Sequence, residues 1–228
     1  MGVDSSGNKD EGAGDQGIMV GYATDETPEL LPLEVVLARR LNQFLYQQWP
    51  YDGKTQVTLR DGQVTSIVAS FQHASQDDLK AAVQNWLQQE DRFTDDIEYH
   101  INPAGDWSIG GFDADAGLTG RKLVIDNYGP RVPIGGGAFS GKDPSKVDRS
   151  AAYAARWAAK HVVASGLSSK CEIQLAYAIG VAKPVSVYVN TLGTGIEDDS
   201  LISERVQSVF DFRPQAIIES LNLRSPIF

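Results

Sequence analysis

The chain has 228 residues, of which 42% are hydrophobic and 22% are charged, as is typical of a globular protein with one or two domains. Its formal net charge is −10, and a surface with that excess of negative charge repels nucleic acid. No apolar run is long enough to span a bilayer, the first residues lack the apolar stretch of a secretory signal, and Cys171 is the single cysteine. These features exclude a disulfide framework and a cysteine-rich zinc site. They predict a cytoplasmic protein that binds neither nucleic acid nor membrane.

The first half of the chain predicts two strand-and-helix groups. The polar residues 1–14 are expected to form a flexible arm. The elements that follow are a strand at 17–23, a helix that begins at Pro32, a hairpin of strands 55–59 and 63–71, a helix capped by Ser75, and a second extended pair at 98–101 and 107–109.

The second half begins with a long irregular stretch, residues 110–148, which is rich in glycine and charged residues. After it come a helix at 148–165, strands at 171–178 and 185–191, and helices at 199–210 and 214–223. This order predicts an α+β fold of repeated hairpin-plus-helix units, in which mixed or antiparallel sheets carry helices on one face. We expect a central α+β domain at 15–109 and a second α+β domain at 110–228, which begins with glycine-rich loops.

Basic residues gather between positions 121 and 149 of this otherwise acidic chain. They include Arg121, Lys122, Lys142, Lys146 and Arg149. A local excess of positive charge favours an anion site, and ordinary solvated surface charges would give the same pattern. Charge alone leaves both interpretations open.

The segment Gly135–Asp143 resembles part of a phosphate-binding P-loop. Asp143 stands where that motif requires Ser or Thr, and Pro144 prevents a helix from beginning directly after it. We therefore reject the P-loop interpretation. The glycines still let the backbone wrap closely around an anion, and Lys142 and Lys146 add positive charge. A flexible glycine-rich linker remains the alternative.

The three histidines and the cysteine indicate no chemistry of their own. His73, His100 and His161 lie far apart in the sequence and share no spacing that is typical of metal ligands. Cys171 begins a predicted strand, where packing in the core is the expected use of its side chain. None of the four is assigned a role.

Five segments, in chain order, are similar to signatures of the methionine adenosyltransferase (S-adenosylmethionine synthetase) family: 12–17, 117–122, 135–143, 146–156 and 177–182. The resemblance implies that the methionine sulfur attacks the ribose C5′ of ATP and expels the triphosphate, which is then hydrolysed. It also implies Mg²⁺ and K⁺ as cofactors.

The resemblance assigns roles to thirteen residues. Catalytic contacts to the triphosphate fall to Arg121, Lys122, Lys142 and Lys146. ATP contacts fall to these and to Asp52, Lys54, Asp106, Trp107, Asp115 and Ala138. Methionine contacts fall to Asp15, Asp115, Lys146 and Ile179, and a Mg²⁺ contact to Asp148. Trp107 replaces the family's adenine-stacking aromatic, and Asp106 replaces a basic residue.

The family carries a further segment before its first motif, and that segment supplies metal, phosphate and methionine ligands. We therefore expect one subunit of a split enzyme, which a partner chain completes. Two alternatives stay open: a regulatory companion of a full-length enzyme, and a self-sufficient homo-oligomeric enzyme. Under each of them the family resemblance implies an oligomer in which subunits stack through flat sheets.

Overall fold

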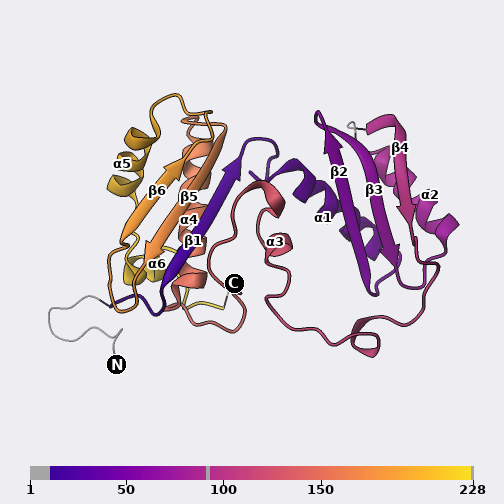
Figure 1. Cartoon of the computed structure of the whole chain (residues 1–228), viewed down its shortest axis with the longest axis horizontal. Helices are drawn as coiled ribbons and strands as arrows, with labels where there is room; N and C mark the ends of the chain where they lie inside the picture. Colours follow the sequence, from indigo (N-terminus) through magenta and orange to yellow (C-terminus); the bar gives the residue numbers. More distant parts are fainter. Residues whose placement is uncertain (1–10, 91–92, 227–228) are drawn as a thin grey trace. The chain divides into compact units, whose positions relative to one another are not determined.

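The computed structural model describes residues 11–90 and 93–226, which fold into two compact units (Figure 1). One unit combines the chain up to Pro32 with residues from Thr119 onward, and the other contains Leu33–Leu118. Residues 15–32, which the sequence analysis assigns to the first of two consecutive domains, thus pack with the C-terminal part of the chain. Among the described residues, no helix has the length and apolar composition that crossing a membrane requires.

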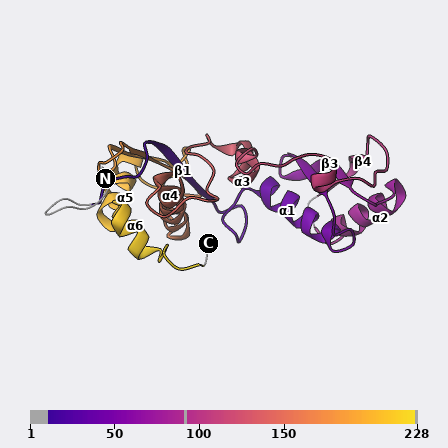
Figure 2. The same ribbon diagram turned by 90° about the horizontal axis from the view of Figure 1, so that it is seen from below.

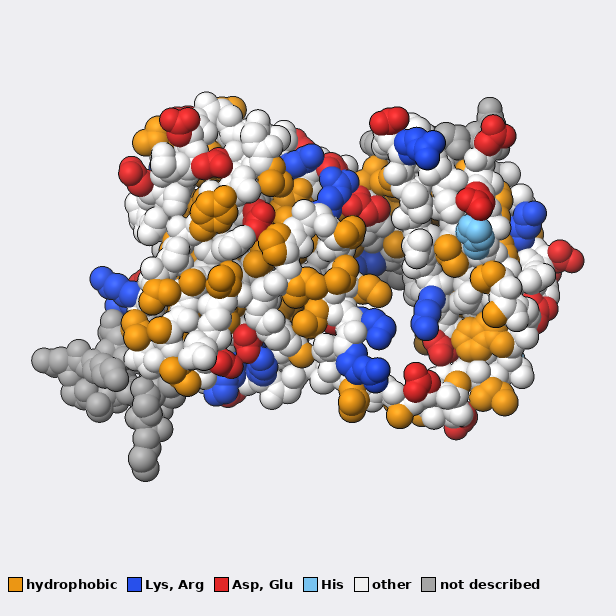
Figure 3. Space-filling model, viewed as in Figure 1, with side chains coloured by type: hydrophobic (Ala, Val, Ile, Leu, Met, Phe, Trp, Pro, Cys, Tyr) orange, Lys and Arg blue, Asp and Glu red, His pale blue; other side chains and the backbone are white. Residues whose placement is uncertain are grey.

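The first unit contains an antiparallel sheet in the order β1-β5-β6. Its strands are β1 (Gly17–Thr24), β5 (Lys170–Tyr177) and β6 (Ser186–Asn190), and its helices are α4 (Val147–Ala164), α5 (Asp199–Val209) and α6 (Pro214–Ser220). Figure 2 shows α4 on one side of this sheet. Figure 3 shows hydrophobic side chains on the face that is turned away from α4.

Small residues let α4 lie unusually close to β1. Six alanines of α4 are buried against the sheet: Ala151, Ala152, Ala154, Ala155, Ala158 and Ala159. A Cβ atom at Gly21, in the middle of β1, would overlap the backbone of Ala155. The alanine-rich face and this glycine together fix the distance between the helix and the sheet.

The second unit contains a mixed sheet in the order β2-β3-β4, with two helices on the same face (Figure 2). The strands are β2 (Gly53–Arg60), β3 (Gln63–Phe71) and β4 (Phe93–Ile101), and the helices are α1 (Leu33–Tyr46) and α2 (Gln76–Leu87). β2 and β3 form the expected hairpin, with both Asp61 and Gly62 at positive φ as its two-residue turn requires. The predicted α+β class, with mixed or antiparallel sheets, is confirmed.

The local signal for the α2 cap was interpreted correctly, and one predicted local strand pairing was not. Ser75 caps α2 as predicted, since its side chain accepts a hydrogen bond from the Asp78 N–H. The predicted pairing of 98–101 with 107–109 is wrong, because β4 instead pairs in parallel with β3 and no strand forms at 107–109. Trp107 crosses the end of β3, where its carbonyl accepts the His73 N–H at 2.9 Å.

The predicted irregular stretch contains only short helical turns: η1 (Gly111–Asp113), α3 (Leu123–Asp126) and η2 (Gly129–Arg131). Most of the predicted flexible arm 1–14 lies outside the described residues. Its last part is held in place instead, because the Ala13 side chain is fully buried and the backbone of residues 13 and 14 is hydrogen-bonded to other loops.

Candidate anion and nucleotide site

Two of the family-like segments, 12–17 and 177–182, meet around residues 12–14 in the first unit, where Ser145 of the loop before α4 joins them. The Gly14 N–H donates to the Ser145 carbonyl at 3.0 Å, the Ala13 N–H donates to the Val181 carbonyl at 3.0 Å, and the Gly180 N–H donates to the Ala13 carbonyl at 2.8 Å. A Cβ atom on residue 14 would overlap the Ser145 carbonyl, so only glycine permits this approach. The first segment therefore joins the loop before α4 to the turn after β5.

The glycine-rich loop 135–143 packs between β1 and the beginning of α4. A Cβ atom on Gly135 would overlap the carbonyl oxygen of Ile18, which shows how closely the loop follows β1. A Cβ atom on Gly120, whose φ is +76°, would overlap the side chain of Ala138. This contact brings the segment 117–122 against the glycine-rich loop.

Lys142 and Asp148 form an ion pair beneath this loop. Asp148 lies in the first turn of α4 and is only 8% exposed, and its carboxylate accepts a hydrogen bond from the Lys142 ammonium group. The positive end of the helix dipole stabilises a carboxylate at that position. Arg149 fixes the backbone of the loop, because its guanidinium donates to the Lys142 carbonyl at 2.7 Å. The lysine ammonium is thus held beside a glycine-lined backbone.

Lys146, the N-cap residue of α4, points to a second carboxylate. Its Nζ lies 3.3 Å from Asp143 Oδ2 and 3.3 Å from Ser145 Oγ. Hydrogen bonds from Ser145, assisted by the charge of Lys146, lower the pKa of Asp143. Asp143 therefore remains ionised, and its carboxylate holds the ammonium group of Lys146 near the loop.

Arg121 and Lys122 are exposed, and within the described part of the chain neither forms an ion pair. The Lys122 Nζ donates to the Arg121 carbonyl at 3.3 Å. Convergence of these two side chains with Lys142 and Lys146 on one phosphate site stays a prediction.

The predicted methionine contacts of this unit lie near its loops. Asp15 is partly exposed, and its carboxylate accepts the Gln16 N–H at 2.8 Å. Ile179 is exposed in the turn after β5. Both side chains are thus accessible to a small ligand.

The second unit gathers three of the predicted ATP contacts at one end of its sheet. Asp52 precedes β2, and its carboxylate accepts the Gly111 N–H at 3.1 Å. Asp106 accepts a hydrogen bond at 3.5 Å from the side-chain amide of Asn102, which is itself fully buried. Trp107 is partly buried and bonded through its carbonyl to the end of β3.

The remaining predicted contacts of the second unit are exposed. Lys54 lies on β2 and Asp115 follows η1. The Asp115 N–H donates to the Gly111 carbonyl at 3.1 Å, so the backbone of this loop is fixed while the carboxylate is left accessible.

The described residues do not form a complete metal site by themselves. No group of three or more His, Cys, Asp or Glu side chains gathers in them to hold an ion. Asp148 offers one suitable carboxylate for Mg²⁺, and this carboxylate is paired with Lys142. Further oxygen ligands would have to come from phosphate, water or residues outside the described part of the chain.

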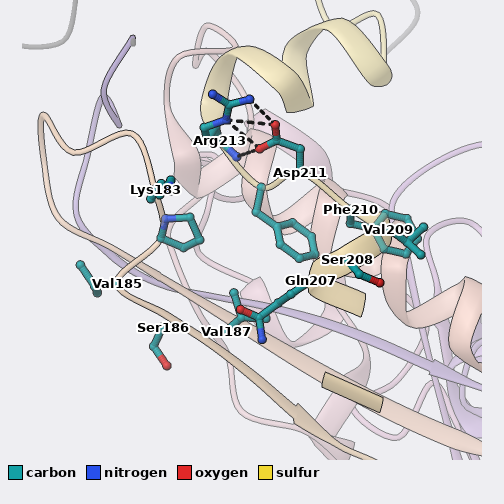
Figure 4. A pocket seen from close by; sticks show the side chains of 12 residues that line it. Lys183, Val185, Ser186, Val187, Gln207, Ser208, Val209, Phe210, Asp211 and Arg213 are labelled. Carbon is teal, nitrogen blue, oxygen red and sulfur yellow. Dashed lines mark hydrogen bonds and ion pairs between the residues drawn. The ribbon is translucent and has the colours of Figure 1, made fainter. Parts of the chain in front are cut away.

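A separate pocket of about 730 Å³ opens in the first unit between residues 183–187 and 207–213 (Figure 4). None of the predicted site residues lines it. Its most polar feature is the ion pair of Asp211 and Arg213, with Nη2 2.5 Å from Oδ2, and the hydrogen bonds from Arg213 lower the pKa of Asp211. This charge pair is satisfied within the protein.

Two residues of the second unit to which the sequence assigned no role, Gln72 and His73, belong to the cluster around Trp107. Gln72 and His73 directly follow β3, and both make contacts with the segment that contains Trp107. A polar pair at the end of a largely buried strand is a signal that could have identified them.

Two sheets with their helices, and a lysine paired with a helix-terminal carboxylate under a glycine-rich loop, define an α+β protein with a candidate anion site. The chain belongs to the S-adenosylmethionine synthetase family, since residues 10–107 match the central domain of that family and residues 109–228 match its C-terminal domain.

Similar proteins carry the corresponding name. The chain is 49% identical to the S-adenosylmethionine synthase of Roseobacter denitrificans, to S-adenosylmethionine synthase 2 of Rhodospirillum rubrum and to the S-adenosylmethionine synthase of Acholeplasma laidlawii. Each match covers 100% of this chain and 63%, 63% and 64% of the relative, respectively. The chain thus spans less than two thirds of the length of these relatives.

Proposed function

We propose that the chain forms part of an active site that makes S-adenosylmethionine from ATP and methionine. The contact between Lys142 and Asp148 is the observation that supports this proposal best. It holds a cation beside a glycine-lined loop at a helix N-terminus, which is an environment that suits a phosphate group. Family membership gives the reaction class to which this local chemistry contributes.

In this reaction a bond forms between the methionine sulfur and ribose C5′, and the bond between C5′ and the triphosphate oxygen breaks. The electron pair of the broken bond stays on the triphosphate, whose growing negative charge must be stabilised. Lys142 and Lys146 perform this role, together with Arg121 and Lys122. Water then cleaves the triphosphate to pyrophosphate and phosphate.

The second unit holds the nucleoside part of ATP in this proposal. The indole of Trp107 stacks on adenine. Asp52 and Lys54, at the start of β2, also bind ATP. Asp106 carries a negative charge. It therefore contacts the nucleotide through its own backbone atoms or at neutral groups of the nucleotide, and not at the phosphates. Ala138, in the glycine-rich loop, is a further ATP contact in this proposal.

Methionine is held by four residues in this proposal. Asp115 binds the amino group as a counter-ion, while Lys146 reaches the methionine side as well. Asp15 and Ile179 line the pocket. Methionine and ATP are thereby oriented for in-line attack, which is where much of the rate enhancement arises.

The remaining third of the relatives' length contributes to the same site, and we propose that a partner chain can supply it. The retained basic residues motivate this idea, because a scaffold without a triphosphate ligand would not need them. Mg²⁺, when bound, neutralises phosphate charge, and Asp148 is one of its ligands. K⁺ is included in the proposal only because the family resemblance implies it. Oligomerisation of the chain is part of the same proposal.

Calorimetric titration of the chain with inorganic tripolyphosphate tests the phosphate-binding role. A charged hydrogen bond contributes about 1.5–3 kcal/mol, so Lys142→Met and Lys146→Met should each weaken binding by about tenfold or more. Lys160→Met, which removes an exposed lysine of the same helix α4, is the matched control and should bind like the unaltered chain. Equal affinities for all four proteins would contradict the proposal.

A further inference from the structure

Three chain segments of the second unit meet at one end of the β2-β3-β4 sheet. Gly53 at the start of β2 pairs with Phe71 at the end of β3, and Ala69 of β3 pairs in parallel with Ile101 at the end of β4. The residues just before β2 and just after β3 and β4 therefore lie side by side. The proposed function assigns the first and third of these segments to the nucleotide, while the segment after β3 has no role so far.

The side-chain amide of Gln72, in this middle segment, joins the other two. Its Oε1 accepts the Asp52 N–H at 3.3 Å, and its Nε2 donates to the Ser108 carbonyl at 2.9 Å. One partner is a backbone donor and the other is a backbone acceptor, so the orientation of the amide is fixed. A Cβ atom on Gly110 would overlap Gln72 Oε1, which shows that the loop backbone lies directly on the amide.

The fixed amide also selects the ring nitrogen of neutral His73 that carries the hydrogen. Gln72 Nε2 lies 3.3 Å from Nε2 of His73. Because the amide nitrogen only donates, the ring nitrogen must accept, and the neutral imidazole then carries its hydrogen on Nδ1. The Nδ1–H of this exposed side chain is a donor that no described protein group accepts.

The backbone of His73 is held in a conformation that is uncommon for residues other than glycine. Its φ is +66°, in the left-handed region, and its N–H donates to the Trp107 carbonyl at 2.9 Å. The ring lies edge-on to Tyr51, with 4.7 Å between centroids. Strain of this kind persists where surrounding contacts enforce it, and it often marks functional sites.

We propose that Gln72 is a positioning residue of the nucleotide site and that His73 donates its Nδ1–H to an acceptor atom of the nucleoside. Gln72 holds Asp52 and the Trp107 segment in register and selects the tautomer that makes His73 a donor. The inference rests on the proposed function and extends it to two residues that had no role.

The tautomer can be measured without any ligand. In ¹⁵N NMR spectra of the imidazole nitrogens, assigned with His73→Asn, the unaltered chain should show the hydrogen of neutral His73 on Nδ1. Gln72→Glu replaces the donating amide by an accepting oxygen, so the hydrogen should move to Nε2. Gln56→Glu, at an exposed position of β2, adds the same charge and should leave the tautomer unchanged. An Nε2–H tautomer in the unaltered chain would overturn the inference.

Calorimetry then tests the role in binding, with two probes: adenylyl imidodiphosphate and inorganic tripolyphosphate. Gln72→Leu and His73→Asn should weaken binding of the nucleotide about tenfold and leave tripolyphosphate binding unchanged, because only the nucleotide carries a nucleoside. Unchanged nucleotide affinity, or an equal loss for both probes, overturns the inference while tripolyphosphate binding still supports the proposed function. If the unaltered chain binds neither probe, the proposed function fails and the nucleotide role of Gln72 fails with it.

Discussion

The ammonium group of Lys142 lies against the carboxylate of Asp148, the most buried charged residue of the candidate site. The pair has a direct consequence for anion binding. A phosphate group that binds Lys142 must compete with Asp148 for the same ammonium hydrogens. Asp148 thus both positions the lysine and weakens its attraction for an anion.

Removing the charge of Asp148 should therefore strengthen binding of metal-free tripolyphosphate. For Asp148→Asn we expect a gain of about 1 kcal/mol, or roughly fivefold in affinity, because the lysine no longer has a competing partner. Titration in the presence of a metal chelator measures this gain. Asp77→Asn, in the first turn of α2, is the matched control. Unchanged or weaker binding by Asp148→Asn would show that the two groups do not compete.

Close packing of α4 on β1 should make Gly21 intolerant of a side chain. Gly21→Ala forces a methyl group into the backbone of α4, and overpacking of this kind typically costs about 1–3 kcal/mol of unfolding free energy. Urea denaturation followed by circular dichroism measures the change. Gly117→Ala serves as the control, because open space surrounds a new Cβ atom there. Equal midpoints for the two variants would mean that helix and strand are farther apart than described.

Cys171 should be inert towards thiol reagents in the folded protein. Burial, reinforced by the nearby charges of Asp199 and Glu172, raises the pKa of its thiol from 9.0 to about 12. The reactive thiolate is therefore absent at pH 8, and labelling by a disulfide reagent should proceed only at the rate of unfolding. Rapid labelling of the native chain at that pH would contradict the buried placement.

The same raised pKa gives the stability of the protein a defined pH dependence. The folded state favours the neutral thiol, so this contribution to stability is complete below the unfolded pKa of 9.0 and is lost as the pH rises towards 12. Cys171→Ala should therefore lose less stability between pH 8 and pH 10 than the unaltered chain does. Parallel losses in denaturant titrations would contradict this linkage.

The sheet face turned away from α4 in the first unit should carry the proposed subunit contact. Ile18 on β1 and Tyr188 on β6 alternate with residues that face α4, and both are about half exposed on that face. Ile18→Asp and Tyr188→Asp should lower the mass seen in analytical ultracentrifugation. Leu201→Asp, at an exposed position on α5, should not change it. A monomeric unaltered chain would contradict the proposed oligomer.

Local chemistry in the sequence predicted much of the fold. The cap at Ser75 and the hairpin turn at Asp61–Gly62 depend on neighbouring residues, and both were identified from the pattern. The pairing of β1 with β5 and the parallel pairing of β3 with β4 join segments that are distant in the chain. Periodicity carries no information about such partners, which is why residues 107–109 were wrongly paired.

For the candidate site, the sequence predicted some of the residues but not the contacts between them. Family-like motifs identified Lys142 and Asp148, but their direct contact depends on how the loop folds back onto α4. Gln72 escaped notice because its role depends on backbone groups of Asp52 and Ser108, which only the sheet brings together. A glutamine after a strand has no distinctive spacing that could reveal this.

The most direct test of the proposed function measures product formation. The chain is mixed with ATP, methionine, Mg²⁺ and K⁺ and with a polypeptide that covers the remaining third of an S-adenosylmethionine synthase, and S-adenosylmethionine is quantified by mass spectrometry. We predict product from the unaltered chain and from Lys160→Met, and a loss of at least about a hundredfold for Lys142→Met. The same product yield with Lys142→Met as with the unaltered chain, or no product from any mixture, would contradict the proposed function.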